Sequence, residues 1–338
     1  MSTVLNAATD IGRDAYMLTS PEGMVLVHEL DSGRRAINVE PRPGFTLSRR
    51  HWETGYPMEL IRAIHRCKGL YLCDEIMREE DPDYVERYLR HEVLGYVEAE
   101  QFRGKRVLDF RCGSGASTMV LGRMLPPCEL IGVEMDDRLL GIARMRATLF
   151  RRDGVRFLRS PAPDSFPDGE GEFDYVMFSA VFEHLLPAER AMLLTLIWKH
   201  IRPGGILFLN QTPHRYSPVE MHTTGLPLIN YLPAGLAWRL ATRLSTHVRP
   251  DDDWPTLLRA GIRGGTVREI LSILSTSGTP QLLAPRKEFG DQIDLWHGKL
   301  SRRHAVFKRG IWAALKVLKF SSGVQLTPEI AIAIRKAS

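Results

Sequence analysis

Short apolar runs alternate with amphipathic stretches through the middle of the chain. Three of these runs, Val107–Phe110, Leu130–Val133 and Phe173–Phe178, are apolar apart from single other positions. Such runs are typical of strands that are buried on both faces of a parallel sheet. The segment Ala191–Ile201 has the apolar spacing of an amphipathic helix. This alternation predicts an α/β domain.

A turn of small residues, 111–117, follows the first of these strands. Gly113 and Gly115 let the backbone approach a ligand closely, because no Cβ intervenes. Thr118 replaces the last glycine of a dinucleotide fingerprint, and no phosphate-binding GxxxxGK sequence follows, so NAD and nucleoside triphosphates are disfavoured. Asp109 would repel a pyrophosphate but could hold an amine. The pattern therefore favours a ligand that has an ammonium group and no phosphate.

The second strand ends at an acidic residue, Glu134. It follows Gly115 at about the 20-residue spacing from which a carboxylate reaches the hydroxyls of a ribose. The alternative is a solvated acidic loop. Helices are expected to begin near Ser117, capped by its hydroxyl, and after Asp136 or Asp137.

Four segments in this order and spacing carry a family resemblance: VLDFRCGSG, LIGVEMDD, FDYVMFSAVFEHL and LIWKHIRPGGILFLNQTP. Together they resemble the class I S-adenosylmethionine-dependent methyltransferases, especially the branch with the quinone-biosynthesis enzymes. The resemblance covers about residues 102–213. It implies a Rossmann-like α/β fold with a seven-stranded, mostly parallel sheet and helices on both faces. It also implies S-adenosyl-L-methionine as the cofactor, bound across the strand ends.

The resemblance also implies cofactor contacts, position by position. These are Asp109, Cys112, Gly113 and Gly115 around the methionine part, Glu134 at the ribose, and in addition Arg111, Met135, Ala162, Ser179 and Ala180. Adenine would be held by backbone groups of 160–162 or by Asp164. The family usually has glycine at position 111, so Arg111 is strained if that position requires a positive φ. Its guanidinium could pair with the cofactor carboxylate or with Asp109, or it could impair the site.

Candidate catalytic residues follow the later strands. In the family the turn at 179–185 faces the acceptor, and His184 could act there as a general base, with Glu183 beside it. The alternative is that both residues only cap and orient the next helix. A long loop at 210–233 contributes His222 as a second candidate, although it could be an ordinary loop residue. The Asn/Asp-Pro-Pro-Tyr/Phe signature of base-methylating enzymes is missing, which disfavours DNA as a substrate.

Composition adds few constraints. The net charge of +5 is mild, the hydrophobic content is 44%, and no run reaches the roughly 18 apolar residues of a membrane span. The four cysteines lack metal-ligand spacing, so no metal site is expected from them. The N-terminus lacks an export signal, so a cytoplasmic location is expected. Nothing in the sequence indicates the oligomeric state.

The outer segments predict two additions to the methyltransferase domain at 101–338. Residues 1–100 would form an N-terminal extension with a hairpin around 31–33 and a helical cap, in which the helix at 84–97 either covers the cofactor or only packs in the core. A lid is expected at about 211–260 and a basic helical insertion at about 299–322. The apolar residues of this insertion either rest on an anionic membrane or pack on the core, and we favour core packing.

These features predict O-methylation of a small-molecule, glycan or lipid-linked acceptor, with His184 or His222 removing the acceptor proton. Two alternatives stay open. One is a binding protein that has lost turnover, which Arg111 supports. The other is an RNA-directed methyltransferase, which the basic helices support weakly because the chain lacks a known RNA-binding module.

Overall fold

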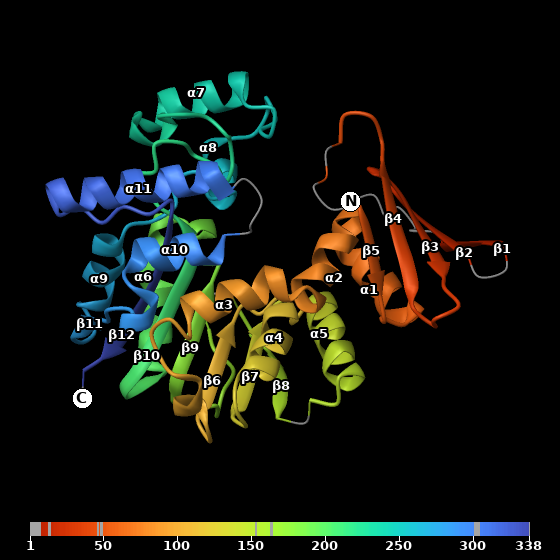
Figure 1. The fold of residues 1–338 in the computed structure, drawn as a ribbon, viewed down its shortest axis with the longest axis horizontal. Helices are drawn as coiled ribbons and strands as arrows, with labels where there is room; N and C mark the ends of the chain where they lie inside the picture. The colour runs from red at the N-terminus through yellow and green to blue at the C-terminus, as the bar shows by residue number, and fades with distance from the viewer. Residues whose placement is uncertain are drawn as a thin grey trace.

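The computed structural model describes residues 8–12, 15–45, 47, 50–152, 154–162, 165–300 and 305–337. They form two sheets joined by helices (Figure 1). The first sheet is antiparallel, with its strands in sequence order: β1 (Ala8–Gly12), β2 (Ala15–Ser20), β3 (Gly23–Glu29), β4 (Arg35–Pro41) and β5 (His51–Thr54). The expected hairpin around 31–33 is confirmed as the pair β3–β4.

The second sheet has seven strands in the order β11-β12-β10-β9-β6-β7-β8. Their bounds are β6 (Arg106–Phe110), β7 (Glu129–Glu134), β8 (Val155–Arg159), β9 (Phe173–Ser179), β10 (Ile201–Pro213), β11 (Pro280–Leu282) and β12 (Glu329–Lys336). The strands from β10 to β8 are mutually parallel, and only β12 and β11 run antiparallel to their neighbours. The predicted seven-stranded, mostly parallel sheet is therefore confirmed.

Eleven α-helices surround the sheets within the described part of the chain. They are α1 (Met58–Lys68), α2 (Leu72–Glu80), α3 (Arg87–Glu92), α4 (Ala116–Met124), α5 (Asp137–Leu149), α6 (Pro187–Lys199), α7 (Ala234–Leu244), α8 (Trp254–Arg259), α9 (Val267–Leu274), α10 (Gln292–Lys299) and α11 (Ala305–Ser322). None of them is long and apolar enough to cross a membrane.

Helices cover both faces of the parallel sheet, as expected. Successive residues of β6 point to opposite faces, so Leu108 packs with α6 and α9 while Val107 packs with α3, α4 and α10. Both residues are fully buried. This double burial explains why the strand sequences read as nearly continuous apolar runs.

The observed N-termini of α4 and α5 agree only partly with those predicted from the sequence. Asp136 caps α5 through its carboxylate, which accepts from the backbone amide of Arg138 at 2.8 Å. The expected Ser117 cap of α4 is wrong, because α4 already begins at Ala116 and its N-cap is Gly115 in a left-handed conformation. No side chain caps α4, and its first residues, Ala116 and Ser117, line the cavity described below.

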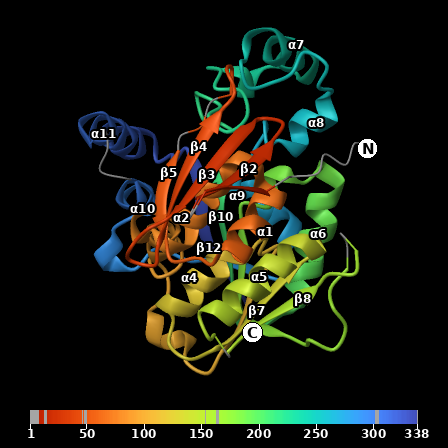
Figure 2. The same ribbon diagram turned by 90° about the vertical axis from the view of Figure 1, so that its right-hand side faces the viewer.

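The N-terminal helices have different roles from those expected. The segment with Val85, Leu89 and Val93 is buried against the parallel sheet and belongs to its core, so the core-packing alternative is correct. The antiparallel sheet packs instead on α1 and α2, which lie between the two sheets (Figure 1). Figure 2 shows the antiparallel sheet in front of these helices. Helices α1 and α2 therefore bring their side chains to the edge of the parallel sheet.

The favoured packing of the apolar residues of the basic insertion on the core is wrong. Helix α11 has no buried residue, and Val306, Phe307 and Phe320 are 87%, 70% and 94% exposed. It is attached to α10 mainly by polar contacts, including the bond from Trp312 Nε1 to Asp294 at 2.8 Å. Core packing would need an apolar stripe wider than the one α11 presents to α10.

Candidate functional site

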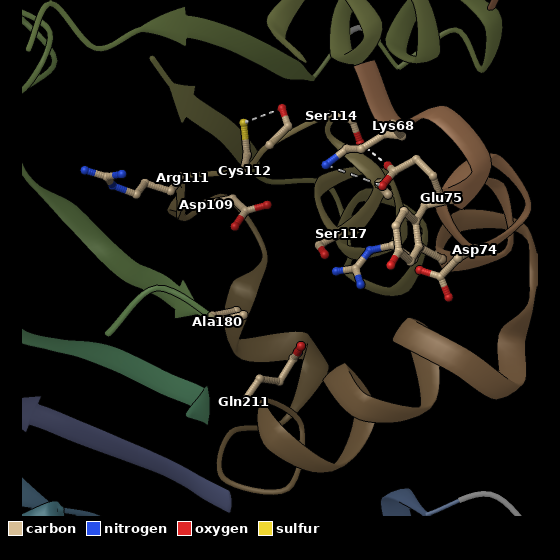
Figure 3. Close-up of a pocket in the computed structure, with 15 residues that line it drawn as sticks. Lys68, Asp74, Glu75, Asp109, Arg111, Cys112, Ser114, Ser117, Ala180 and Gln211 are labelled. Atoms are coloured by element: carbon tan, nitrogen blue, oxygen red, sulfur yellow. Dashed lines mark hydrogen bonds and ion pairs between the residues drawn. The ribbon is translucent and has the colours of Figure 1, made fainter. Parts of the chain in front are cut away.

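A cavity of about 430 Å³ opens at the carboxyl end of β6 (Figure 3). Its lining comes from the β6–α4 turn, from α1 and α2, and from the ends of β9 and β10. The lining residues are Lys68, Tyr71, Asp74, Glu75, Arg78, Asp109, Arg111, Cys112, Gly113, Ser114, Ala116, Ser117, Ser179, Ala180 and Gln211. Ligands of open parallel sheets bind at this edge of the strands.

Backbone strain is concentrated around this cavity. Among the described residues, five other than glycine have positive φ, and three of them line the cavity: Arg111 at 57°, Ala180 at 53° and Gln211 at 59°. Such conformations cost about 1–3 kcal/mol each and cluster at functional sites. Position 111 thus requires the left-handed conformation that a glycine would adopt freely, and Arg111 is strained as the sequence analysis anticipated.

The two glycines of the turn have different neighbours. A Cβ on Gly115 would lie 2.8 Å from the Cβ of Ala143 and 3.0 Å from the ring of Phe157, so this glycine allows α4 and α5 to approach. A Cβ on Gly113 would meet nothing within 4 Å. Gly113 therefore borders the open space of the cavity, whereas Gly115 borders the core.

Asp109 places a buried carboxyl group in the cavity wall. It is 4% exposed, and burial raises its pKa to about 6, although the bond donated by Thr118 Oγ1 at 2.6 Å lowers it. The nearby Glu134 carboxylate raises this pKa further, and Arg78 lowers it. A cationic group bound beside Asp109 would favour the ionised carboxylate.

The charged residues of α1 and α2 were missed as site residues by the sequence analysis. Lys68 and Arg78 bring positive charge to the cavity, and Asp74 brings negative charge. Asp74 and Arg78 are four residues apart and share one face of α2. This spacing was the one sequence feature that could have indicated these site residues. It is equally typical of a helix whose charged face is exposed to solvent.

Arg111 points away from this cavity and from Asp109 (Figure 3). It lines a second cavity of about 310 Å³ with Met135, Leu185, Glu189, Met192, Leu193 and Arg259. Burial lowers its pKa, while the carboxylates of Glu134 and Glu189 raise it. The suggested pairing of Arg111 with Asp109 is therefore wrong, because the guanidinium lies on the other side of the turn.

Glu134 lies between the two cavities, although it lines neither. Its carboxylate accepts from the backbone amides of Gly113 at 3.0 Å, Met135 at 2.7 Å and Asp136 at 3.2 Å. A carboxylate has about four acceptor positions, so one is left for a hydroxyl group.

Of the two adenine contacts expected after β8, only the backbone groups near Ala162 lie within the described residues. Ala162 lines neither cavity, its amide donates to Ser165 Oγ, and its carbonyl accepts from Ser160 Oγ. These backbone groups are already paired within the loop. Asp164 lies outside the described residues.

The three candidate catalytic residues come together, although they lie in two separate segments. Glu183, His184 and His222 each have one atom that could bind a metal ion, and these three atoms all lie within 4.8 Å of one another. Glu183 and His184 belong to the short helix η4 (Phe182–His184), and His222 comes from the loop after β10. None of the three is among the residues that line the first cavity. Glu183 is linked to it through Thr212, which follows the lining residue Gln211, whereas His222 lines a separate small cavity with His214 and Glu220.

Hydrogen bonds to Arg259 and Thr212 hold His184 and Glu183 in place. His184 Nδ1 donates to the carbonyl of Arg259 at 2.7 Å, which leaves Nε2 without a proton in the neutral ring and 3.7 Å from Glu183 Oε1. Glu183 is fully buried, and its Oε2 accepts from Thr212 Oγ1 at 3.0 Å. Burial raises the pKa of Glu183. Partial desolvation of the ring lowers the pKa of His222, although much of that residue is exposed. The simple capping alternative does not describe this arrangement, because the N-cap of α6 is Leu186. Glu183 and His184 bond instead to Thr212 and to the Arg259 carbonyl.

Residues 107–205 match the family described as the methyltransferase domain. The region they form is a class I S-adenosylmethionine-dependent methyltransferase domain. The chain is 30% identical over 42% of its length to 53% of the fatty-acid O-methyltransferase of Mycolicibacterium smegmatis. It is 32% identical over 32% of its length to 48% of the demethylmenaquinone methyltransferase of Thermus thermophilus. The chain spans about half the length of these curated relatives.

Among solved structures, a glycopeptide N-methyltransferase complexed with S-adenosyl-L-methionine is similar to the chain. The sequence identity is 22% and the TM-score 0.30, with 36% of this chain and 52% of the other covered.

S-adenosyl-L-methionine is the cofactor of this methyltransferase domain. The cleft contains charged and polar groups that match the parts of this molecule. Asp109 suits the ammonium group, and Lys68 or Arg78 suits the carboxylate of the methionine part. Gly113 leaves open the space that a side chain would occupy. Glu134 has one acceptor position left that a ribose hydroxyl could use, and Met135 in the second cavity could contact the base.

Proposed function

We propose that the protein is an S-adenosylmethionine-dependent O-methyltransferase whose acceptor is a small molecule, a glycan or a lipid-linked intermediate. The observation that carries this proposal is that Glu183, His184 and His222 meet beside Thr212, which follows the cavity residue Gln211 in β10. Oxygen acceptors benefit from removal of a proton, and an imidazole nitrogen of this cluster can accept one.

The bound cofactor supplies an activated methyl group on a sulfonium, so the chain mainly has to position the acceptor and exclude water. His184 Nε2 accepts the acceptor hydroxyl proton while the oxygen takes the methyl group. The Arg259 carbonyl holds the tautomer that makes Nε2 available. Glu183, 3.7 Å from Nε2, stabilises the resulting imidazolium.

The lid offers both polar and apolar surface to an acceptor. His214, Glu220 and His222 line a small cavity of about 110 Å³. Met221, Leu228 and Tyr231 of the same loop are 78%, 60% and 51% exposed. This combination supports an acceptor that carries its hydroxyl group on a larger apolar body. The similarity to a fatty-acid O-methyltransferase and to the ubiquinone biosynthesis O-methyltransferase of Rhizobium etli agrees with such a substrate.

Incubation of the protein with methyl-labelled cofactor and fractionated cell extract tests the proposal. We expect label in the small-molecule or lipid fraction, as an ether or ester, and at least tenfold less with His184→Gln. The exposed His247→Gln variant is the matched control and should transfer at the normal rate. Label confined to protein or RNA would contradict the proposed acceptor class.

We also propose that the protein works in the cytoplasm at an anionic membrane surface, with α11 as the contact. Val306, Val317 and Phe320 share one exposed face of this helix, which also carries basic residues such as Arg309. Sedimentation with phosphatidylglycerol vesicles should retain the protein, and Phe320→Ser should reduce retention several-fold. The exposed Leu149→Ser on α5 should have no effect. Equal retention on neutral phosphatidylcholine vesicles would contradict the electrostatic part of this proposal.

Binding without turnover is the second candidate, and the strained Arg111 favours it. Calorimetry with S-adenosylhomocysteine separates the two candidates when combined with the extract assay. Binding without transfer to any fraction would favour the second.

A further inference from the structure

The buried side of the catalytic cluster contains a carboxylate oxygen without a partner. Glu183 Oε1 has no hydrogen-bond donor, although Glu183 is completely buried. Its other oxygen is bonded to Thr212, so the carboxylate is held in place with Oε1 directed toward the two imidazoles. An unpaired buried carboxylate oxygen is costly, and the geometry around it suits a cation.

We propose that Glu183, His184 and His222 bind one divalent transition-metal ion. Each residue contributes one ligand atom, and these atoms lie within 4.8 Å of one another. Ligands at zinc distances from a common ion are about 3.3 Å apart, so side-chain shifts of about 1 Å would close the site. Two imidazoles and one carboxylate form a known catalytic ligand set for zinc and leave coordination positions open.

The surroundings of the ligands support a metal site. The bond from His184 Nδ1 to the Arg259 carbonyl is the outer contact that metal-binding histidines usually make, and it directs the Nε2 lone pair into the cluster. Thr212 has the same role toward Glu183. Both contacts orient a ligand without occupying its coordinating atom.

Gly261 permits the approach of the third ligand. It has φ of 98°, and a Cβ at this position would lie 2.6 Å from the His222 ring and 3.4 Å from Glu183 Cγ. Only glycine therefore lets the lid histidine close over the buried carboxylate.

The role of the ion rests on the proposed function, whereas its binding does not. An ion held by these three ligands has open positions for an acceptor hydroxyl and lowers the pKa of that hydroxyl. The acceptor then loses its proton to water and presents an oxyanion for methylation. With the imidazole lone pairs engaged, the ion replaces His184 in favouring proton loss. This narrows the acceptor to compounds with a coordinating oxygen, such as a phenol with a neighbouring oxygen substituent.

Zinc titration of the chelator-treated full chain at pH 7.5, by calorimetry and by cobalt absorption spectroscopy, tests the site. We expect one ion per chain, with affinity lowered at least tenfold by His222→Ala and by Glu183→Gln. His247→Ala, an exposed histidine of the same lid, should bind the metal like the wild type. Circular dichroism identifies any variant that fails to fold, and the exposed position of His222 keeps one variant interpretable.

Two outcomes would overturn the proposal. One is the absence of stoichiometric binding to the wild type, and the other is binding that both ligand variants leave unchanged. S-adenosylhomocysteine binding is measured on the same samples. Cofactor binding without metal binding refutes the metal site alone, and metal binding without cofactor binding refutes the proposed function alone.

Discussion

At the scale of the residue, the ligand chemistry of the cleft depends on the ionisation of Asp109. Its folded-state pKa of about 6 lies above the ordinary aspartate value, so the folded protein takes up a proton as the pH falls through 6. A protonated carboxyl group loses its attraction for the ammonium group of the cofactor.

The affinity for S-adenosylhomocysteine should therefore be constant above pH 7 and fall below pH 6, by up to about tenfold per pH unit. Calorimetry between pH 5 and 8 measures this dependence. Asp109→Asn should bind more weakly and lose the dependence over this range. Thr118→Val should move the midpoint to higher pH, because the bond from Thr118 lowers the pKa of Asp109. A flat profile for the wild type would show that Asp109 does not contact the ammonium group.

Replacing Arg111 tests whether backbone strain at the β6–α4 turn impairs cofactor binding. Arg111→Gly should raise the free energy of unfolding by about 1 kcal/mol, because glycine adopts a φ of 57° without strain. Urea denaturation measures this change. Because the guanidinium points away from the cavity, S-adenosylhomocysteine affinity should change less than threefold. Binding that appears only in the variant would establish that the wild-type site is impaired.

At the scale of the element, the two glycines of the β6–α4 turn have different roles. Gly115 allows close packing, and Gly113 leaves room for a ligand. Gly113 and Gly115 both have positive φ, at 57° and 77°, so alanine strains the backbone similarly at either position. Only at Gly115 would the new Cβ also collide with α5 and β8.

We expect Gly115→Ala to lower the free energy of unfolding by about 1–3 kcal/mol more than Gly113→Ala does. The order should reverse for the cofactor: Gly113→Ala should weaken S-adenosylhomocysteine binding more, because its methyl group enters the cavity. Chemical denaturation and calorimetry on both variants provide the comparison. Equal losses of stability would mean that α4 and α5 can separate at low cost.

At the scale of the whole molecule, a buried ion pair joins the N-terminal region to the methyltransferase domain. Arg146 of α5 is completely buried and donates to Glu75 Oε1 of α2 at 3.1 Å and to the carbonyl of Ser114 at 2.8 Å. Burial opposes ionisation of Glu75, but Arg146 and other nearby cations lower its pKa below the usual value. The pair thus holds α2 against the turn that borders the cofactor cavity.

Glu75→Gln and Arg146→Met should each lower the free energy of unfolding by about 3–5 kcal/mol, and the double variant by much less than their sum. Since the pKa of Glu75 is lowered on folding, the stability from this pair is present above pH 5 and lost as the pH falls below 4. Arg90→Ala, which breaks the exposed Arg90–Glu86 pair, should change stability by less than about 1 kcal/mol. Additive effects in the cycle would show that the two side chains are not coupled.

The parts of the fold that could be predicted are those set by local pattern. The strands around Leu108 and Val133 were evident because double burial leaves apolar runs, and the cap at Asp136 because the carboxylate lies next to the amides it accepts from. The five-stranded N-terminal sheet was predicted only as the hairpin β3–β4. Helix α11 was misjudged because an amphipathic pattern is the same whether its apolar face meets a core, a membrane or water.

The sequence by itself determined the α/β class, the methyltransferase segments and the identity of the candidate residues, since each depends on neighbours within a few positions or on a fixed spacing. The tertiary structure decided which residues meet. It joined His222 to Glu183 and His184, turned Arg111 away from Asp109, and brought α1 and α2 to the cavity wall. The physical reason is that these contacts join segments far apart in the chain, whose distances are set by the packing of the whole molecule.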